Sequence, residues 1–223
     1  FEDKDLKNSL IKFFCLLILA SGISTYGLLS NSVATIIGAM IIAPLMLPIV
    51  GLAFGISIGD GPAIKHTLII SLAGIAIAIA VGFILSLPIH SVIQPESVDQ
   101  IMSRTSPRLL DLSAALVTGI AGAFAMSRRD VSDTLPGVAI AISLVPPLAN
   151  TGILLATFNY SLALGSLLLF FTNYFAILLT GAAIFGLMGF SRVAGINRSL
   201  NVRRKSIAIV VVMIFLISVP LAV

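Results

Sequence analysis

The sequence predicts an all-α fold: a polytopic bundle of about seven transmembrane helices, arranged as an inverted 3+3 repeat with proline-broken middle helices. Composition is the first indication, because 58% of the 223 residues are hydrophobic, 10% are charged and the mean hydropathy is +1.15. A soluble domain of this size carries far more charge on its surface. The second indication is a pair of apolar stretches interrupted by prolines, at Pro44 and at Pro146.

The chain opens with a charged segment followed by an apolar one. Residues 1–10 mix charges with apolar residues at near-helical spacing, which predicts an interfacial lead-in helix, with a partner-binding segment as the alternative. Lys12–Ser30 is apolar and makes about 28 Å of helix, enough to cross a bilayer. It is the first of three spans in a predicted first repeat, residues 11–88. The acidic residues before it and the lack of a small-residue cleavage pattern argue against a signal peptide.

The second predicted span, Val33–Gly59, cannot be one uninterrupted helix. Pro44 and Pro48 remove two backbone donors, and their rings crowd earlier carbonyls. In hydrocarbon each freed carbonyl must find another partner, so such a break survives only inside protein or beside a water-filled cavity.

Small residues and a polar turn follow this break. A short turn is expected over residues 60–66, and the third span over Thr67–Leu87. Small residues at a spacing of four let helices approach closely, which predicts a packing face at the end of the broken span. That face comprises Gly51, Gly55 and Gly59.

Residues 89–108 form the longest polar connection in the first half and are predicted to be an external loop. Ser106 before Pro107 is typical of a helix start, with a capping hydroxyl and then proline at the first helical position. Asp111 would then lie about one turn inside the helix, where the positive end of the helix dipole favours a carboxylate. This helix begins the predicted second repeat, residues 109–190, again with three spans.

The second half of the chain repeats the order of the first. Leu135–Phe158 is the second broken span, with Pro146 and Pro147 in adjacent positions. After it come an apolar stretch to Phe190, a basic cytoplasmic loop at residues 191–206 and the start of a seventh span at residues 207–223. We expect the sequence, which begins with Phe1 and ends in an apolar run, to be part of a longer polypeptide.

Basic residues predict the orientation in the membrane. Lys and Arg number 11 on the side of the N-terminus: three at the N-terminus up to Lys12, one at Lys65, two at Arg128–Arg129 and five in residues 191–206. The opposite side has 2. Cytoplasmic loops carry the excess of basic residues, so the sequence predicts a multi-pass protein of the cell (inner) membrane with a cytoplasmic N-terminus.

An internal repeat is predicted from the order of the spans and from weak sequence identity. A shift of 99 residues gives five identities in fourteen positions: Thr35 with Thr134, Gly38 with Gly137, Ile41 with Ile140, Leu45 with Leu144 and Pro48 with Pro147. Both breaks fall about 16 Å into their spans, near the midplane. Because three spans make up each repeat, the second would be inverted, and paired broken helices in such a repeat indicate a substrate site between them.

The candidate site residues are polar groups and helix-breaking prolines at membrane depth, where polar groups are costly and tend to mark pathways. The predicted solute pathway comprises Pro44, Pro48, Ser143, Pro146, Pro147, Asn150 and Asn173. For each asparagine, a simple bond to a neighbouring helix backbone is the alternative. Arg104 and Asp111 are predicted to form an ion pair at the entrance, or a structural pair that fixes the helix start.

Other classes of function find little support in the residues. Cys15 is the single cysteine and lies in an apolar run, while His66 and His90 have no further ligand at metal-binding spacing. We therefore expect no metal, no cofactor and no catalytic residue, hence not an enzyme, and no nucleic-acid partner. Ser57-Ile-Gly-Asp60 lacks the first glycine of the Gly-x-Gly-Asp pattern of intramembrane aspartyl proteases, and no Tyr-Asp partner exists.

Three motifs resemble one prokaryotic membrane family. They are Gly38-Ala-Met-Ile-Ile-Ala-Pro-Leu-Met, Arg104-Thr-x-Pro-x-x-x-Asp-Leu and Pro136-Gly-Val-Ala-Ile-Ala-Ile-Ser-Leu-Val-Pro-Pro-Leu. The family is catalogued as domain of unknown function 389, also called the uncharacterised hydrophobic domain. The resemblance implies a bacterial or archaeal membrane protein, often with a soluble cytosolic domain in the same polypeptide. It implies no activity.

Two functions follow from these observations. The first is a membrane transporter or channel for a small solute or ion, with its site at the midplane between the two broken helices. The second is a non-transporting, oligomeric membrane anchor or sensor for a cytosolic domain outside this chain. In either case the expected partners are the lipid bilayer and further copies of the chain, because glycine faces also suit subunit interfaces.

Overall fold

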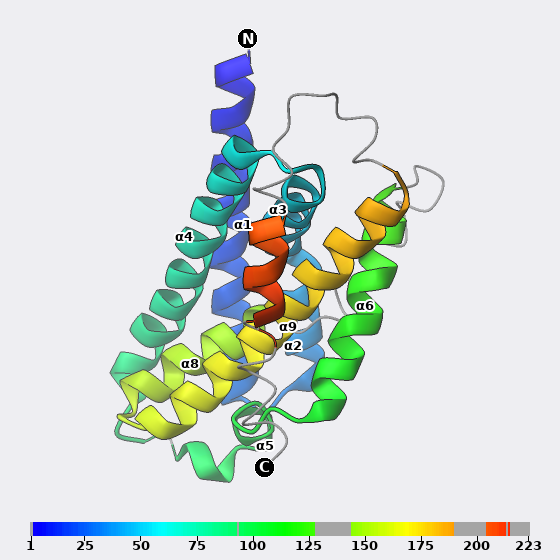
Figure 1. The fold of residues 1–223 in the computed structure, drawn as a ribbon. Coiled ribbons are helices and arrows are strands. Elements are labelled where there is room, and N and C mark those ends of the chain that lie inside the picture. The colour runs from blue at the N-terminus through cyan, green and yellow to red at the C-terminus, as the bar shows by residue number, and fades with distance from the viewer. Residues whose placement is uncertain (1, 93, 128–143, 190–203, 213, 215–223) are drawn as a thin grey trace. The chain divides into compact units, whose positions relative to one another are not determined.

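The computed structural model describes residues 2–92, 94–127, 144–189, 204–212 and 214, and for residues 2–6 only the backbone. All regular elements in these residues are helices (Figure 1), which confirms the all-α class. Three predicted features lie wholly or largely outside the described residues: the first half of the second broken span with Ser143, most of the basic loop, and most of the seventh span.

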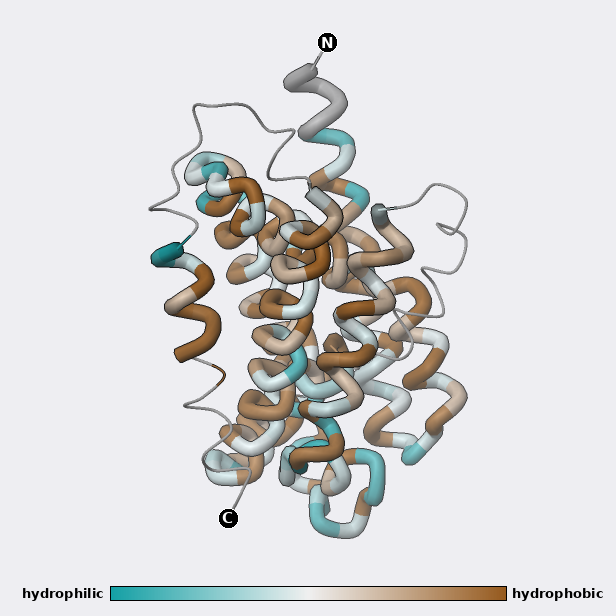
Figure 2. Tube along the Cα trace, turned by 45° about the vertical axis from the view of Figure 1, so that its right-hand side comes forward, coloured by the Kyte–Doolittle hydropathy of each residue, from teal (hydrophilic) through white to brown (hydrophobic). Residues whose placement is uncertain are grey.

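Several helices are long and apolar enough to cross a membrane. In the described part of the chain there are four: Lys7–Leu29 in α1 (Glu2–Leu29), Gly61–Ile89 with α4 (Gly61–Ser86), α6 (Leu109–Ser127) and α9 (Tyr160–Leu187). The pair α2 (Val33–Ile42) and α3 (Met46–Ile58) makes a fifth if it is counted as one span, bent by 50°. Figure 2 shows the resulting long hydrophobic stretches along the helices.

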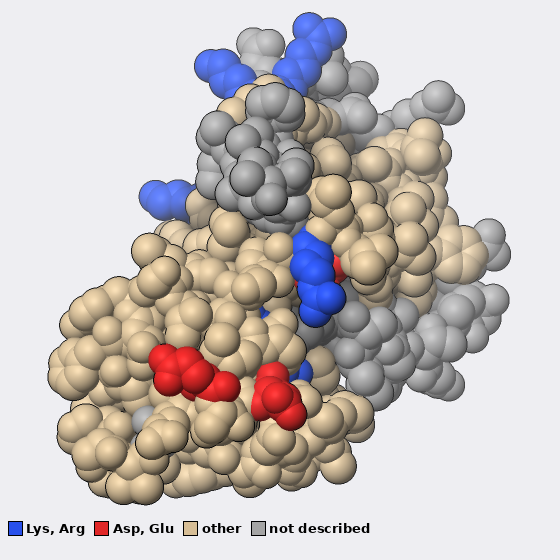
Figure 3. Space-filling model, turned by 90° about the horizontal axis from the view of Figure 1, so that it is seen from below, with Lys and Arg blue, Asp and Glu red and all other residues tan. Residues whose placement is uncertain are grey.

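The outer surfaces of these helices are apolar. Leu110, Val117, Leu164 and Leu187 are each exposed over two thirds of their surface or more. Figure 3 shows a face of the molecule on which most side chains are uncharged. Exposed apolar surface of this extent is unfavourable in water and favourable against lipid tails.

The chain folds into two compact units, each made of three separate segments. The first unit comprises residues 1–45, 72–106 and 144–167, and the second comprises residues 46–71, 107–143 and 168–223. The first contains α1, α2, most of α4, the short helices η1 (Leu87–Ile89), η2 (Pro95–Ser97) and α5 (Asp99–Met102), and α8 (Val145–Ala156). The second contains α3, α6 and most of α9.

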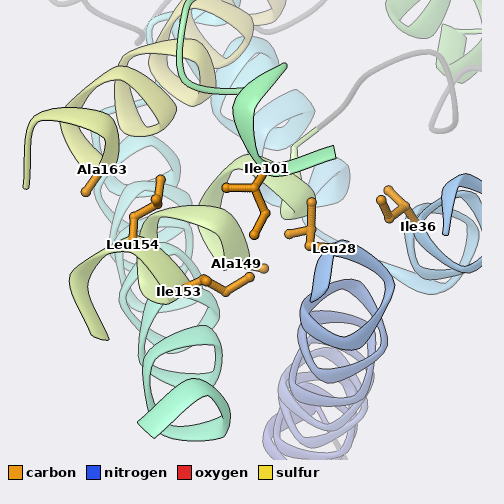
Figure 4. Close-up of a cluster of buried hydrophobic side chains, with 7 residues drawn as sticks. All are labelled: Leu28, Ile36, Ile101, Ala149, Ile153, Leu154 and Ala163. Carbon is orange, nitrogen blue, oxygen red and sulfur yellow. The ribbon is translucent and has the colours of Figure 1, made fainter. Parts of the chain in front are cut away.

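The core of the first unit gathers side chains from five helices around α8 (Figure 4). Its members are Leu28, Ile36, Ile101, Ala149, Ile153, Leu154 and Ala163. All residues of α8 except Leu155 are buried. A helix of 12 residues is about 18 Å long, too short to span a bilayer, and its burial on every side supplies the apolar surroundings that its sequence requires.

Glycines let α4 approach α8 to backbone contact within the first unit. A Cβ atom on Gly152 would collide with the carbonyl of Ile79 and the amide of Phe83, and one on Gly82 would collide with the carbonyl of Ala149. In lipid no hydrophobic driving force brings helices together, so close van der Waals packing at small residues is what stabilises such a contact.

In the second unit small residues serve the same purpose. A Cβ on Gly51 would lie 3.3 Å from the methyl of Thr67, and one on Gly55 would lie 3.2 Å from Ile64, so α3 packs closely on the first turns of α4. This confirms the predicted packing role of those two glycines. Gly59 instead ends α3 with a φ of 74°, a conformation that costs little only for glycine.

Two helix–helix turns in the chain share one backbone pattern. Gly59–Asp60 joins α3 to α4, and Phe158–Asn159 joins α8 to α9. The first residue of each has positive φ, 74° at Gly59 and 60° at Phe158. In each turn the two amides bond back to carbonyls of the preceding helix: Gly59 to Ile56, Asp60 to Gly55, Phe158 to Leu155 and Asn159 to Leu154.

Two helix starts differ from the sequence prediction. The turn expected over residues 60–66 is already helical from Gly61, because the Asp60 carboxylate accepts a bond from the Ala63 amide at 3.2 Å and caps α4. In contrast, α6 begins at Leu109 and not at Pro107, because the Asp111 carboxylate accepts the Arg108 amide at 2.8 Å. The lead-in segment and first span form one continuous helix, α1.

Candidate solute site at the broken helices

The first break lies between α2 and α3, where the sequence predicts it. The Ala43 amide still donates to the Ala39 carbonyl at 3.1 Å, but the Ala43 backbone is extended, with φ −67° and ψ 120°. Pro44 has no amide hydrogen, so the Met40 carbonyl loses the bond that a continuous helix would supply. The break therefore leaves backbone acceptors free for another partner.

Packing within the first unit shows the level of this break along α1. The side chains of Leu45 and Leu17 both lie against Gly74 of α4, at 3.0 and 3.2 Å from the position of its missing Cβ. Leu17 is midway along the apolar part of α1. The break is thus level with the middle of the first long helix.

The other prolines start helices. Pro48 is the third residue of α3, while Pro146 and Pro147 are the second and third residues of α8. The amide hydrogens in the first turn of a helix have no acceptor within the helix, so a proline there loses no hydrogen bond. All three are buried. Only Pro44, of the candidate prolines, interrupts a described helix.

Asn150 is the centre of a buried polar node. Its Nδ2 donates to the Ile101 carbonyl at 3.1 Å and to the Ser166 hydroxyl at 3.0 Å. The Ser166 hydroxyl donates in turn to the Pro147 carbonyl at 3.0 Å. Asn150, Ser166 and Ile101 are fully buried. The node joins α8 to the first turns of α9 and to α5, all within the first unit.

The node and the first break lie at different levels of α1. Ile101 packs with Leu28, which is in the last turn of α1, whereas the break is level with Leu17. Asn150 is therefore closer to one end of the first long helix than the midplane position expected from the sequence. The reason is that α8 begins at Val145 and packs beside the connection of residues 89–108 that contains α5, called the α5 connection below.

One atom of the node has no hydrogen-bond partner in the part of the chain that the structure describes. Asn150 Oδ1 is buried and unpaired. A buried amide oxygen normally accepts at least one bond, and leaving it unpaired costs roughly 1–3 kcal/mol. The buried face of α1 has two similar groups, the hydroxyls of Ser21 and Ser24.

Arg104 lies next to this node in the chain. Its Nη1 donates to the carbonyl and the side-chain oxygen of Gln100 and to the Ser103 hydroxyl, while its Nε is buried and unpaired. Burial lowers the pKa of the Arg104 guanidinium, which nevertheless stays a cation at neutral pH. All three acceptors are neutral, and among the described residues no hydrogen bond joins Arg104 to a carboxylate.

Asp111 and Asn173, two further candidates, belong to the second unit. Asp111 accepts the Arg108 amide and so fixes the start of α6. Arg104 belongs to the first unit, and its ion pair with Asp111 stays a prediction. Asn173 is buried midway along α9, and its part in a pathway stays a prediction too. Ser143 lies outside the described residues.

The sequence prediction missed Ser166 and the Ile101 carbonyl. A carbonyl carries no signal in the sequence. Ser166 does carry a weak one, because the shift of 99 residues pairs it with Thr67, another hydroxyl at the same place after its turn. Among the described residues, no group of three or more His, Cys, Asp or Glu side chains comes together in a way that could hold a metal ion.

Comparisons with known proteins identify relatives but no activity. The family described as "Domain of unknown function (DUF389)" matches residues 40–179. An uncharacterized protein of Methanocaldococcus jannaschii is 32% identical over 189 residues, which cover 84% of this chain and 57% of the relative. The chain thus spans little more than half of that relative's length. No solved structure matches the chain.

Proposed function

Because the chain belongs to the DUF389 family, whose description names no activity, we propose a function from the chemistry of its helices: a membrane transporter or channel for a small solute or ion. The observation that carries the proposal is the break at Pro44, level with the middle of α1. A helix interrupted at mid-depth leaves backbone acceptors that only protein or a wet cavity can satisfy, and such breaks are characteristic of solute and ion sites.

The groups available to the solute are mostly neutral oxygens and amides. In the described long helices the charged side chains lie near the ends, for example Lys65 at the start of α4 and Asp111 at the start of α6. Carbonyls at the break, the Asn150 amide and the Ser166 hydroxyl remain. This set suits coordination by dipoles and does not suit a proton relay built on buried carboxylates.

An internal repeat with a register of 99 residues supports two related broken helices. The starts of α3 and α8, Met46 and Val145, are 99 residues apart, and so are the starts of α4 and α9, Gly61 and Tyr160. All four amide-to-carbonyl bonds of the two shared turns keep the same offset. Equal offsets in helix starts, backbone bonds and positive φ are stronger support than five identities in an apolar sequence.

The close helix contacts keep this register as well. Gly152 of α8 packs against Gly82 of α4 in the first unit, and Gly181 of α9 packs against Ala53 of α3 in the second. Each residue of the first contact lies 99 positions from one residue of the second. We infer two copies of one three-span motif, which an odd number of spans would insert with opposite orientations.

The distribution of basic residues supports the proposed orientation, an inner-membrane protein with a cytoplasmic N-terminus and an external connection at residues 89–108. Further copies of the chain and a cytosolic domain outside it are the proposed partners. Cysteines introduced singly at Glu96 and Arg128, in a Cys15→Ala background, test this. A membrane-impermeant maleimide applied to intact cells should label position 96 and leave position 128 unlabelled until the membrane is opened. The reverse pattern would overturn the orientation.

Flux through reconstituted vesicles tests the function itself. Purified protein in liposomes is screened with ions, organic anions and neutral polar solutes, and the Asn150→Leu variant is compared with wild type. Leucine fills the space of asparagine, and both partner atoms keep a second bond, from the Arg104 amide to Ile101 and from Ser166 to Pro147. We expect a folded variant with flux reduced about three- to tenfold, as for one lost hydrogen bond.

Two outcomes would change this conclusion. Unchanged flux in the leucine variant would remove Asn150 from the pathway. Wild-type protein that conducts none of the screened solutes would favour the alternative function, an oligomeric anchor or sensor for a cytosolic domain. Circular dichroism and gel filtration of each variant separate loss of flux from loss of folding.

A further inference from the structure

Two buried polar atoms of opposite hydrogen-bonding character, one in the α5 connection and one on α8, have no hydrogen-bond partner among the described residues. Arg104 Nε is a cationic donor and Asn150 Oδ1 is a neutral acceptor. Each is costly to leave unpaired, and the charged one more so. Buried groups left in this state commonly meet a ligand or an ordered water in the working protein.

The two residues are held together by one shared acceptor. The Ile101 carbonyl accepts the Arg104 amide at 3.2 Å and Asn150 Nδ2 at 3.1 Å. Ile101 itself is fully buried in the core of the first unit. The guanidinium-bearing turn and the amide of α8 are therefore fixed against each other through the same peptide group.

The surrounding contacts make this arrangement rigid. The Gln100 amide donates to Asn31 Oδ1 at 3.0 Å, which fastens α5 to the end of α1. At the other side of the turn the Thr105 carbonyl lies so close to Gly165 that any Cβ there would collide with it. Ser166, the next residue, bonds to Asn150. A site with fixed donors and acceptors binds with little loss of conformational freedom.

The charge balance decides the class of ligand. Among the described residues, every acceptor that bonds to Arg104 is neutral, so a carboxylate is the natural partner of its free Nε–H, and guanidinium groups favour carboxylates. Asn150 Oδ1 accepts only, so the ligand must also bring a hydroxyl or ammonium donor. A simple cation would meet repulsion from Arg104, and a neutral polyol would leave the guanidinium uncompensated.

We infer that Arg104 and Asn150, oriented by Ser166, bind a small organic acid through its carboxylate and a neighbouring hydroxyl group. This deepens the proposed function, on which it rests, by naming the solute class and an initial binding point at the α5 connection. The first break, level with Leu17, would then lie further along the same route.

Equilibrium binding to purified full-length protein in detergent tests the inference without a flux assay. The probes are lactate and malate, with propionate and succinate as matched acids that lack the hydroxyl, and 1,2-propanediol as the match that lacks the carboxylate. Calorimetry should detect the two hydroxy acids, weaker binding of the plain acids by about three- to tenfold, and no binding of the diol.

Variants assign the binding to the two residues. Arg104→Gln should weaken lactate or malate binding by about ten- to a hundredfold, the usual loss for a charge-assisted bond. Arg108→Gln is the matched control, because Arg108 is an exposed arginine in the same connection and loses the same charge. Asn150→Leu should remove the preference for the hydroxy acid over the plain acid. Melting temperatures report whether each variant is folded.

Each result has a distinct meaning. Failure of both hydroxy acids to bind folded wild-type protein overturns the inference, even if the vesicles conduct other solutes, and then the transport proposal stands alone. Equal effects of Arg104→Gln and Arg108→Gln also overturn it, because they reveal general electrostatics. If the acids bind with the expected pattern but the vesicles show no flux, the binding site is supported and the transport proposal is overturned.

Discussion

The hairpins α3–α4 and α8–α9 share a backbone conformation at their turns and differ in the side chains between their helices. Both turns have a positive-φ residue followed by a residue that starts the next helix, and the amides bond to equivalent carbonyls. At the positions that face each other across the hairpin, α3–α4 has Gly51 and Thr67, whereas α8–α9 has Asn150 and Ser166. One pair makes an apolar contact and the other a hydrogen bond.

The hydroxyls show why the two pairs behave differently. Thr67 donates to the Ala63 carbonyl at 2.7 Å, so its hydroxyl stays within α4 and its methyl meets Gly51. Ser166 donates across the hairpin to Pro147 and accepts from Asn150. Both hairpins therefore keep the same packing geometry, whereas at this pair of positions only α8–α9 has a polar bond between its two helices. A search for function should therefore start where the two halves differ.

The largest difference between the two hairpins is expected when the close contact of α8 with α4 is filled. Gly152→Ala places a Cβ against the backbone of α4, so we expect a loss of about 3 kcal/mol of stability, the upper end for overpacking. The equivalent residue is Ala53, which already has a Cβ, and Ala53→Gly should cost only about 1 kcal/mol from helix propensity. Thermal melts in detergent provide the measurement; equal melting temperatures for wild type and Gly152→Ala would contradict the backbone contact.

The two positive-φ residues should respond with opposite signs. Gly59→Ala forces a side chain into the left-handed region and should destabilise by about 1–2 kcal/mol. Phe158→Gly relieves the same strain and should stabilise by up to about 1 kcal/mol, because the ring is largely exposed and meets His90 edge-on. Denaturant or thermal unfolding of both variants checks the signs. If both destabilise, Phe158 has a packing role that its exposure does not reveal.

The smallest effect concerns the hydroxyls themselves. Ser166→Ala removes an interhelical bond and should cost about 0.6–1.7 kcal/mol, the range for such bonds in membrane proteins. Thr67→Val removes only a bond within its own helix and should be close to neutral. Thermal melts of the two variants in detergent measure the difference between their losses of stability. Equal losses would mean that the polar node does not hold α8 and α9 together.

Much of the helical framework was predictable from the sequence, because apolar length and proline position follow from chemistry that each residue carries itself. The break at Pro44 and the packing of Gly51 and Gly55 belong to this class. The start of α4 at Gly61 was missed, since it depends on the Asp60 side chain turning to cap it. In the sequence alone, a charged residue in an apolar context indicates a loop as readily as a helix cap.

The site was predictable in part. Asn150 stood out as an amide in an apolar stretch, but its partners come from residues 49 positions before and 16 positions after it in the chain. Periodicity cannot supply such pairings, and one of the partners is a backbone carbonyl. The level of Asn150 near Leu28 depends on how α8 packs, which chain position alone does not determine.

The division of each unit into three distant segments has a consequence for synthesis. The first unit needs residues 1–45 and also residues 144–167, so Leu28 and Ile36 cannot meet Leu154 until the ribosome has made more than a hundred further residues. At roughly 5–20 residues per second this takes on the order of 10 s. During that interval α1 and α2 must keep their apolar faces against other neighbours. Nascent chains truncated before residue 144 should therefore remain accessible to insertion factors and to membrane proteases.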